Sequence, residues 1–183
     1  MPPRLTPSCA ASARSQRTLL EAEGVPFRGD RLRGLEGYRA WAPPEWSPPR
    51  SDEEEAFLAA ALSRADVWFL LAIAQGKAVG HVALSPFTMV QPQPPPAGTI
   101  NLWQLFVRPP WQGRGVAAQL MRAAVVEARG RGFARMRLWT PSDAARARRF
   151  YEREGWSKTG STRDRASVGL PVVQYARALP GGA

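Results

Sequence analysis

The sequence predicts a single α/β domain organised around a mixed sheet. Segments 67–74 and 77–85 are rich in apolar residues and flank a Gln-Gly turn, so we expect them to form an antiparallel hairpin. Farther along the chain, a strand at 99–107, a helix from 116 and a strand at 133–140 follow one another, which predicts a parallel crossover. The 183 residues, 44% of them hydrophobic, suffice for one domain with a core and are too few to suggest two.

The N-terminal region carries few signals of regular structure. Residues 1–18 lack acidic residues and are rich in Ser, Pro and Arg, a composition similar to that of a transit peptide, but their prolines disfavour an amphipathic helix. Paired prolines and aromatic residues in 34–50 predict a loop with short helical turns that packs against the domain. We therefore expect a poorly defined tail over residues 1–35 and the single domain over residues 36–183.

Capping signals and apolar periodicity predict the first two helices. Ser51, with an acidic residue three positions later, matches a capping box, so a helix is expected over 52–64. Apolar residues recur at helical spacing from 116 onward, and this amphipathic helix is expected to end at Gly130 or Gly132.

The C-terminal part of the chain predicts one more helix and two more strands. Ser142 or Asp143 is the expected cap of the helix, and Gly155 is its expected stop. Strands are expected at 156–160 and 171–179, with a polar connection between them.

The cysteine and histidine counts exclude several classes of chemistry. Cys9 and His81 are the only residues of their types, so a disulfide framework or a Cys/His zinc site cannot be assembled within the chain, and we expect no metal. His81 is interpreted as a strand residue, because no G-x-S-x-G elbow accompanies it. The longest apolar run, 67–74, is far shorter than the roughly 20 residues that cross a bilayer. We therefore expect a soluble, cytoplasmic protein without a membrane partner.

The net charge of +10 raises the hypothesis of nucleic-acid binding. Only Lys77 and Lys158 of the 25 basic residues are lysines, and the arginines are spread along the chain. The densest group, at 146–153, lies on a predicted amphipathic helix with acidic residues interspersed, which is typical of a solvated face. A basic nucleic-acid-binding module is therefore the less favoured alternative.

A glycine pair marks the junction between strand 99–107 and the helix that follows it. Gly113 and Gly115 permit a left-handed backbone and keep side chains away from a ligand, and a helix start offers free N–H groups at the positive end of its dipole. The pattern predicts a phosphate-binding loop; a loop that binds nothing is the alternative. With Ala118 the pair also matches a dinucleotide fingerprint, but that match is weak alone and RPPWQ intervenes after the strand. The nucleotide P-loop pattern is absent.

The segment around this glycine pair resembles a known family signature. VRPPWQGRGVAAQLM resembles the acetyl-CoA signature of the GNAT N-acetyltransferase superfamily, Q/R-x-x-G-x-G/A, with Gln112, Gly115 and Ala117 in register. A second segment, ARARRFYEREGW, resembles the family's A-x-x-F-Y-x-x-x-G-F/W motif. The residues that match this second motif are Ala147, Phe150, Tyr151, Gly155 and Trp156. Two motifs with a strand and helix between them are more specific than either alone, and the resemblance covers residues 51–179.

The resemblance implies the GNAT fold, with a twisted mixed sheet of about six to seven strands, and acetyl-CoA as the co-substrate. Strands 102–107 and 136–140 would separate at a bulge, and pantetheine would pair there with the backbone at Phe106 and Val107. The diphosphate would rest on the amides of Gln112, Gly113, Arg114, Gly115, Val116 and Ala117. For the Arg114 side chain, a charge contribution and a solvent-facing position both stay open.

The implied reaction is direct transfer of acetyl from acetyl-CoA to an amine, with the Val107 N–H as donor to the oxyanion. Tyr151 would protonate the leaving thiolate, although packing beside Phe150 is its structural alternative. Many relatives have a glutamate where this chain has Gln104, which cannot accept the proton. Gln104 could orient a water or the acceptor, or be a half-buried strand residue satisfied by its neighbours; both stay open. A second departure is Ala144, where relatives often have an asparagine that touches the cofactor.

The acceptor is not predicted by these residues. A small amine, an aminoglycoside, an amino acid and a peptide or protein amine all stay open. A non-catalytic acyl-CoA-binding regulator of the same fold is the alternative that Gln104 makes credible. A homodimer, common among relatives, also stays open.

Overall fold

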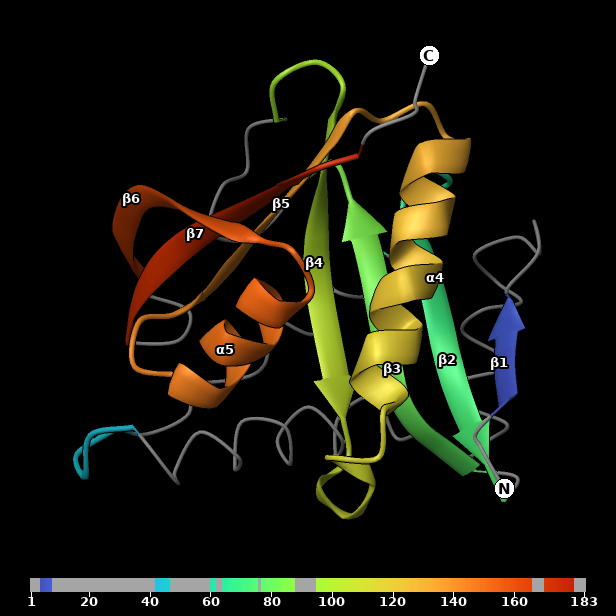
Figure 1. The fold of residues 1–183 in the computed structure, drawn as a ribbon, viewed down its shortest axis with the longest axis horizontal. Helices are drawn as coiled ribbons and strands as arrows, with labels where there is room; N and C mark the ends of the chain where they lie inside the picture. The colour runs from blue at the N-terminus through green and yellow to red at the C-terminus, as the bar shows by residue number, and fades with distance from the viewer. Residues whose placement is uncertain are drawn as a thin grey trace.

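The computed structural model describes residues 4–7, 42–46, 60–61, 64–75, 77–87, 95–165 and 170–179. These residues form a 7-stranded sheet in the order β1-β2-β3-β4-β5-β7-β6, with helices α4 and α5 in front of it (Figure 1). The predicted α/β class and mixed sheet are confirmed. None of the described helices is both long enough and apolar enough to cross a membrane.

The described strands and helices have the following bounds. The strands are β1 (Arg4–Pro7), β2 (Trp68–Ala74), β3 (Lys77–Ser85), β4 (Thr99–Val107), β5 (Arg135–Pro141), β6 (Ser157–Arg165) and β7 (Leu170–Ala178). The helices are the 3-10 turn η2 (Pro109–Trp111), α4 (Val116–Gly130) and α5 (Ala145–Arg153). All neighbouring strands are antiparallel except β4 and β5, which are parallel.

The predicted hairpin and crossover are both confirmed. β2 and β3 pair antiparallel, and β4 leads through α4 to a parallel β5. β3 and β4 have the predicted bounds residue for residue, and α4 ends at Gly130, the first of its two predicted stops.

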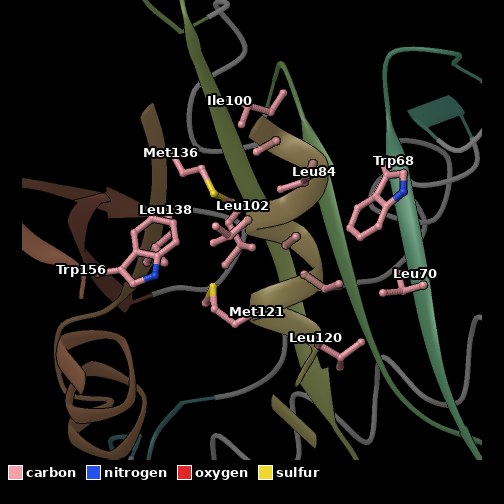
Figure 2. Close-up of a cluster of buried hydrophobic side chains, with 14 of the residues drawn as sticks. Trp68, Leu70, Leu84, Ile100, Leu102, Leu120, Met121, Met136, Leu138 and Trp156 are labelled. Atoms are coloured by element: carbon pink, nitrogen blue, oxygen red, sulfur yellow. The ribbon is translucent and has the colours of Figure 1, made fainter. Parts of the chain in front are cut away.

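The core lies between α4 and the sheet. Helical periodicity places one face of α4 inward, and the residues buried on it are Val116, Leu120, Met121, Ala124, Val125 and Ala128. Figure 2 shows Leu120 and Met121 of this face between Trp68 of β2 and a group that includes Met136 and Trp156. Each fully buried leucine or methionine contributes about 1.5–3 kcal/mol of burial free energy, so this packing fixes α4, and with it the loop at its start, against β4.

The predicted cap of α5 is wrong. The N-cap is Ala144, and it makes no side-chain cap hydrogen bond. Ser142 is held to β7, because its N–H donates to Pro171 O at 2.9 Å, and to α5, because its carbonyl accepts from Arg148 Nη1 at 2.6 Å. Neither Ser142 nor Asp143 therefore starts the helix. The predicted stop holds, since Gly155 follows α5 with a φ of 80°.

The prediction of a polar connection directly after residue 160 is also wrong, because β6 continues to Arg165. β6 is an edge strand, and its side chains from Ser157 to Arg163 are exposed. Polar side chains are therefore tolerated there, and the apolar pattern that predicts interior strands is missing.

Some predicted segments lie outside the described residues. These include Cys9, the proline-rich residues 88–94 and most of the helix expected at 52–64. Of that helix, residues 60–61 are described and helical, and Arg64 is described and not helical. Within the region expected to be a loose tail, Arg4–Pro7 pairs with β2 and forms the opposite edge of the sheet.

Candidate active site

β4 and β5 separate partway along their length. Their ladder runs only from Thr99 opposite Arg135 to Asn101 opposite Arg137. β5 then continues beside β7, and β4 continues to Val107 beside β3 alone among the described strands. Figure 1 shows the two ribbons diverging below this ladder, so the predicted splay is confirmed. Among the described strands, none pairs with the β5-side edge of β4 after Asn101.

A bulge in β4 lies just beyond the last ladder pair. Ala83 is opposite Gln104 while Leu84 is opposite Leu102, so Trp103 is an extra residue in β4. The bulge exchanges the two faces of the strand, because Leu102 before it and Leu105 after it both contact the α4 core. Gln104 therefore points to the face away from α4, which we call the distal face.

The Val107 N–H points into the opening between β4 and β5. Arg108 N–H donates to Val79 O on β3 at 2.9 Å, and successive N–H groups of a strand point to opposite sides. The Val107 carbonyl, on the same side as its N–H, accepts from Gln112 Nε2 at 3.0 Å. A fixed main-chain donor thus faces the place where the two strands separate.

The loop before α4 presents unpaired main-chain donors. Gly113 and Gly115 have φ values of 77° and 80°, the left-handed conformation predicted for them. Within the described chain, no N–H from Gly113 to Ala118 donates to a backbone carbonyl, and the first that does is Gln119, to Gly115 O at 3.1 Å. A Cβ at either glycine would meet no atom of the described residues within 4 Å, so this part of the chain leaves the space in front of the loop open. Such a row of N–H groups at a helix start fits a diphosphate.

Gln112 acts differently from its glycine neighbours. Its N–H donates to Pro109 O at 3.1 Å, so this amide is engaged and the row of unpaired N–H groups begins at Gly113. Its side chain links Val107 to α5, since Oε1 accepts from Arg146 Nη1 at 3.0 Å. Arg114 lies with its guanidinium carbon 5.4 Å from the centre of the Trp111 ring, which keeps a positive charge at the loop.

Tyr151 of α5 lies in an aromatic cluster on the α4 side of the sheet. Its ring is half-buried, 6.2 Å from the rings of both Trp156 and Tyr175. Tyr175 is buried and donates from its hydroxyl to Glu152 Oε1 at 2.8 Å; burial and then this hydrogen bond raise the pKa of Tyr175. The Arg146 contact with Gln112 brings α5 beside the loop that follows β4 (Figure 1).

The distal face beside the bulge is aromatic. His81 is half-buried between two rings, 5.0 Å from Phe69 and 5.6 Å from Phe106, which agrees with its interpretation as a strand residue. Gln104 is half-buried on this face. Within the described residues, no group of His, Cys, Asp and Glu side chains could hold a metal ion.

Sequence reasoning missed two polar residues on the distal face, Asn101 and Arg137. Both are buried, and Arg137 Nε donates to Asn101 Oδ1 at 2.6 Å. The available signal was the alternation in each strand, where a polar residue stands between apolar residues that face the core.

A sheet that opens beside a helix start lined with unpaired N–H groups defines the GNAT fold. The model of the acetyltransferase (GNAT) family matches residues 35–156, and the chain belongs to this family. No curated protein matches its sequence significantly.

Solved structures share the fold at low sequence identity. The PaiA N-acetyltransferase from Thermoplasma acidophilum in complex with coenzyme A is similar with a TM-score of 0.64 and 16% identity, over 97% of this chain and 99% of that one. A GNAT-family acetyltransferase from Staphylococcus aureus is similar with a TM-score of 0.64 and 14% identity, over 97% and 99%. One from Elizabethkingia anophelis with acetyl-CoA bound is similar with a TM-score of 0.53 and 14% identity, over 70% and 85%.

Proposed function

We propose that this chain is an acetyl-CoA-dependent N-acetyltransferase with a single catalytic domain, which comprises residues 36–183 and the edge strand β1. The observation that carries the proposal is the row of unpaired N–H groups from Gly113 to Ala118, beside a β4 edge that lacks a partner. A CoA ligand needs both features, because its diphosphate requires donors and its pantetheine arm carries amides that pair like a strand. The coenzyme A complex of a protein with the same fold supports this choice.

The loop and the strand edge hold the two parts of the co-substrate. The amides of Gly113, Gly115, Val116 and Ala117 bind the diphosphate, and the Arg114 charge adds to this field. Gln112 contributes through its side chain, which fixes the loop to the end of β4. The pantetheine arm lies along the unpaired edge toward Val107. The Phe106 carbonyl faces Gly80 of β3, so the expected pairing of pantetheine with the Phe106 backbone is not part of the proposal.

Two tasks of the reaction fall to Val107 and Tyr151. Acetyl-CoA supplies an activated thioester. The Val107 N–H stabilises the negative charge that develops on the carbonyl oxygen when the amine nitrogen attacks, and it is fixed in advance by the β3 ladder. Tyr151 gives its hydroxyl proton to the leaving sulfur as the C–S bond breaks, because a phenol with pKa near 10 suits a thiolate of pKa near 8.5.

The amine must reach the thioester in its neutral form. The Gln104 amide accepts no proton at neutral pH, so it orients a water or the amine while the proton leaves through solvent. Activity should therefore rise with pH until the acceptor amine itself is neutral.

Two measurements test the proposal together. Calorimetry should detect CoA and acetyl-CoA binding to the purified chain, and thioester consumption should then be followed across a panel of amines. Absence of CoA binding at millimolar ligand contradicts the proposal. CoA binding without turnover on any amine indicates instead the non-catalytic acyl-CoA-binding regulator.

A further inference from the structure

Arg137 occupies an unusual place for an arginine. It lies in the middle of β5 between Met136 and Leu138, which belong to the core under α4, so its side chain is on the distal face. Its relative exposure is 7%. Arginine is almost never this buried unless it is paired, because an uncompensated charge loses its hydration.

The pairing of Arg137 is incomplete. Nε donates to Asn101 Oδ1 at 2.6 Å, and Asn101 Nδ2 in turn donates to Ser85 O at 3.0 Å, which fixes the amide's orientation and that of the guanidinium. Arg137 Nη2 is buried without a hydrogen-bond partner. No ion pair joins Arg137 to a carboxylate among the described side chains.

Two neighbours extend this arrangement of donors. Trp139, two residues along on the same face, has a buried Nε1 that also lacks a partner. The Arg163 guanidinium carbon lies 5.5 Å from the centre of the Trp139 ring, and Arg163 is exposed. Burial, and then the Arg163 charge, lower the pKa of Arg137. Two positive charges and two unused N–H donors thus lie close together, and exposure increases from Arg137 through Trp139 to Arg163.

These donors lie on the distal face at the closed end of the opening between β4 and β5. Asn101 and Arg137 are the last pair of the β4–β5 ladder, so Arg137 is at the narrow end of the opening. Gln104 is on the same face, just beyond the bulge. Asn101 precedes Val107 by six residues of β4, so a molecule bound at Arg137 extends along the opening for its amine to reach the acetyl carbon.

We infer that Arg137, Trp139 and Arg163 bind a carboxylate of the acceptor, so that the acceptor is an amine that also carries a carboxylate group. This inference rests on the proposed N-acetyltransferase function. A carboxylate is planar, accepts from a guanidinium and an indole N–H together, and compensates the buried charge. The carboxylate would pass the exposed Arg163 before it reaches Arg137, which gives the second arginine a role.

Paired substrates give the direct test. Amino acids and their carboxamides carry the same amine, and the carboxamide amine has the lower pKa, so a preference for the amino acid cannot arise from amine reactivity. We expect the wild-type chain to favour the carboxylate in kcat/KM by about tenfold or more for at least one pair, as one charged hydrogen bond is worth ~1.5–3 kcal/mol. Arg137→Met should abolish this preference, and Arg137→Lys should weaken it. Arg135→Met, at an exposed position on the same strand, should retain it.

Separate readouts keep the inference and the proposed function distinguishable. CoA affinity measured by calorimetry should be the same in all four proteins. Arg137→Met should change the melting temperature by only a few degrees, because removal of a buried charge offsets the loss of the hydrogen bond to Asn101 Oδ1. If no amine is turned over, the carboxylate preference is measured by calorimetry instead, as the binding of N-acetyl amino acids to the chain in the presence of CoA.

Several results would overturn the inference while leaving CoA-dependent activity intact. These are a preference for carboxamides in every pair, a stronger preference for a phosphomonoester amine, and a carboxylate preference that persists in Arg137→Met. If no amine is turned over and no N-acetyl amino acid binds at millimolar concentration in the calorimeter, the inference is also overturned.

Discussion

Arg146 of α5 donates from Nη1 to Oε1 of Gln112 at 3.0 Å, and the same Gln112 side chain donates from Nε2 to Val107 O at 3.0 Å. One glutamine thus ties together the end of β4, the loop before α4 and the start of α5. These are the elements that carry the proposed oxyanion donor, diphosphate site and general acid. The two family motifs, far apart in sequence, therefore meet through this side chain.

Removing the Arg146 side chain should weaken CoA binding. Without it, Gln112 loses one of its two partners and the loop is less well fixed. The Kd of CoA in Arg146→Ala should rise about twofold to tenfold, because one exposed hydrogen bond is worth ~0.5–1.5 kcal/mol. Arg149→Ala, an exposed arginine of the same helix, is the matched control and should leave the Kd unchanged. Equal effects of both variants in calorimetry would show that only the net charge matters.

A methyl group at Gly115 should block the diphosphate. Gly115 has a φ of 80° and open space where a Cβ would stand. Gly115→Ala should destabilise the fold by about 1 kcal/mol through its dihedral angle, a shift in Tm of about 2–4 °C, and should weaken CoA binding more than about tenfold.

Gly132 supplies the control for Gly115, since its φ is 79° and a Cβ there would also meet no atom within 4 Å, yet it follows the far end of α4. Gly132→Ala should cost the same stability and leave CoA affinity unchanged. If both alanine variants bind CoA like the wild-type chain, the loop is not the diphosphate site.

Gly80 permits the close approach of β3 to β4. A Cβ on Gly80 would lie 2.7 Å from Phe106 O, a backbone atom that cannot move aside, and 3.3 Å from side-chain atoms of Leu120 and Val107. Gly80→Ala should therefore cost about 2–3 kcal/mol of unfolding free energy in urea titration. Gly130→Ala, where a Cβ meets nothing within 4 Å and φ is not positive, should be neutral or stabilising by up to about 1 kcal/mol. Similar losses in both variants would contradict the steric account.

The apolar pattern of the sequence predicted those strands and helices whose apolar residues are buried in the core. β3 and β4 are interior strands whose apolar residues must face the core, and their bounds were predicted correctly. β6 is an edge strand with exposed polar residues, so its length depends on pairing with β7 and is not visible in its own sequence. The α5 start was wrong for a similar reason, because the contact of Ser142 with Pro171 is distant in sequence.

The residues of the candidate site also include some that the sequence predicted and some that it did not. Gly113 and Gly115 were predicted because left-handed conformations favour glycine, and their φ values agree. The role of the Gln112 side chain and the donors of Arg137 were not predicted, because each depends on a partner from another element. Chemistry that arises from long-range pairing becomes apparent only once the sheet register is known.

Tyr175 should make the stability of the fold fall at alkaline pH. Its pKa is raised above the usual value of about 10, so the unfolded chain loses this proton first and binds fewer protons than the folded chain. The stabilisation is present below pH about 10 and is lost as the pH rises through the folded pKa. Tyr175→Phe should cost about 1–2 kcal/mol at neutral pH, because the bond to Glu152 is lost, and should show a shallower alkaline loss. Parallel curves for the two proteins in urea titrations across this range would contradict the assignment.

Tyr151→Phe tests the general acid. Without the hydroxyl, the sulfur must leave as the free thiolate or take its proton from water, so kcat should fall about 10²-fold or more while the Kd of CoA stays unchanged. Tyr175→Phe is the matched control, since its hydroxyl is committed to Glu152 and its ring lies in the same cluster. It should lose stability and keep kcat. Turnover by Tyr151→Phe equal to that of the wild-type chain at every pH would mean that Tyr151 only packs against Trp156 and its neighbours.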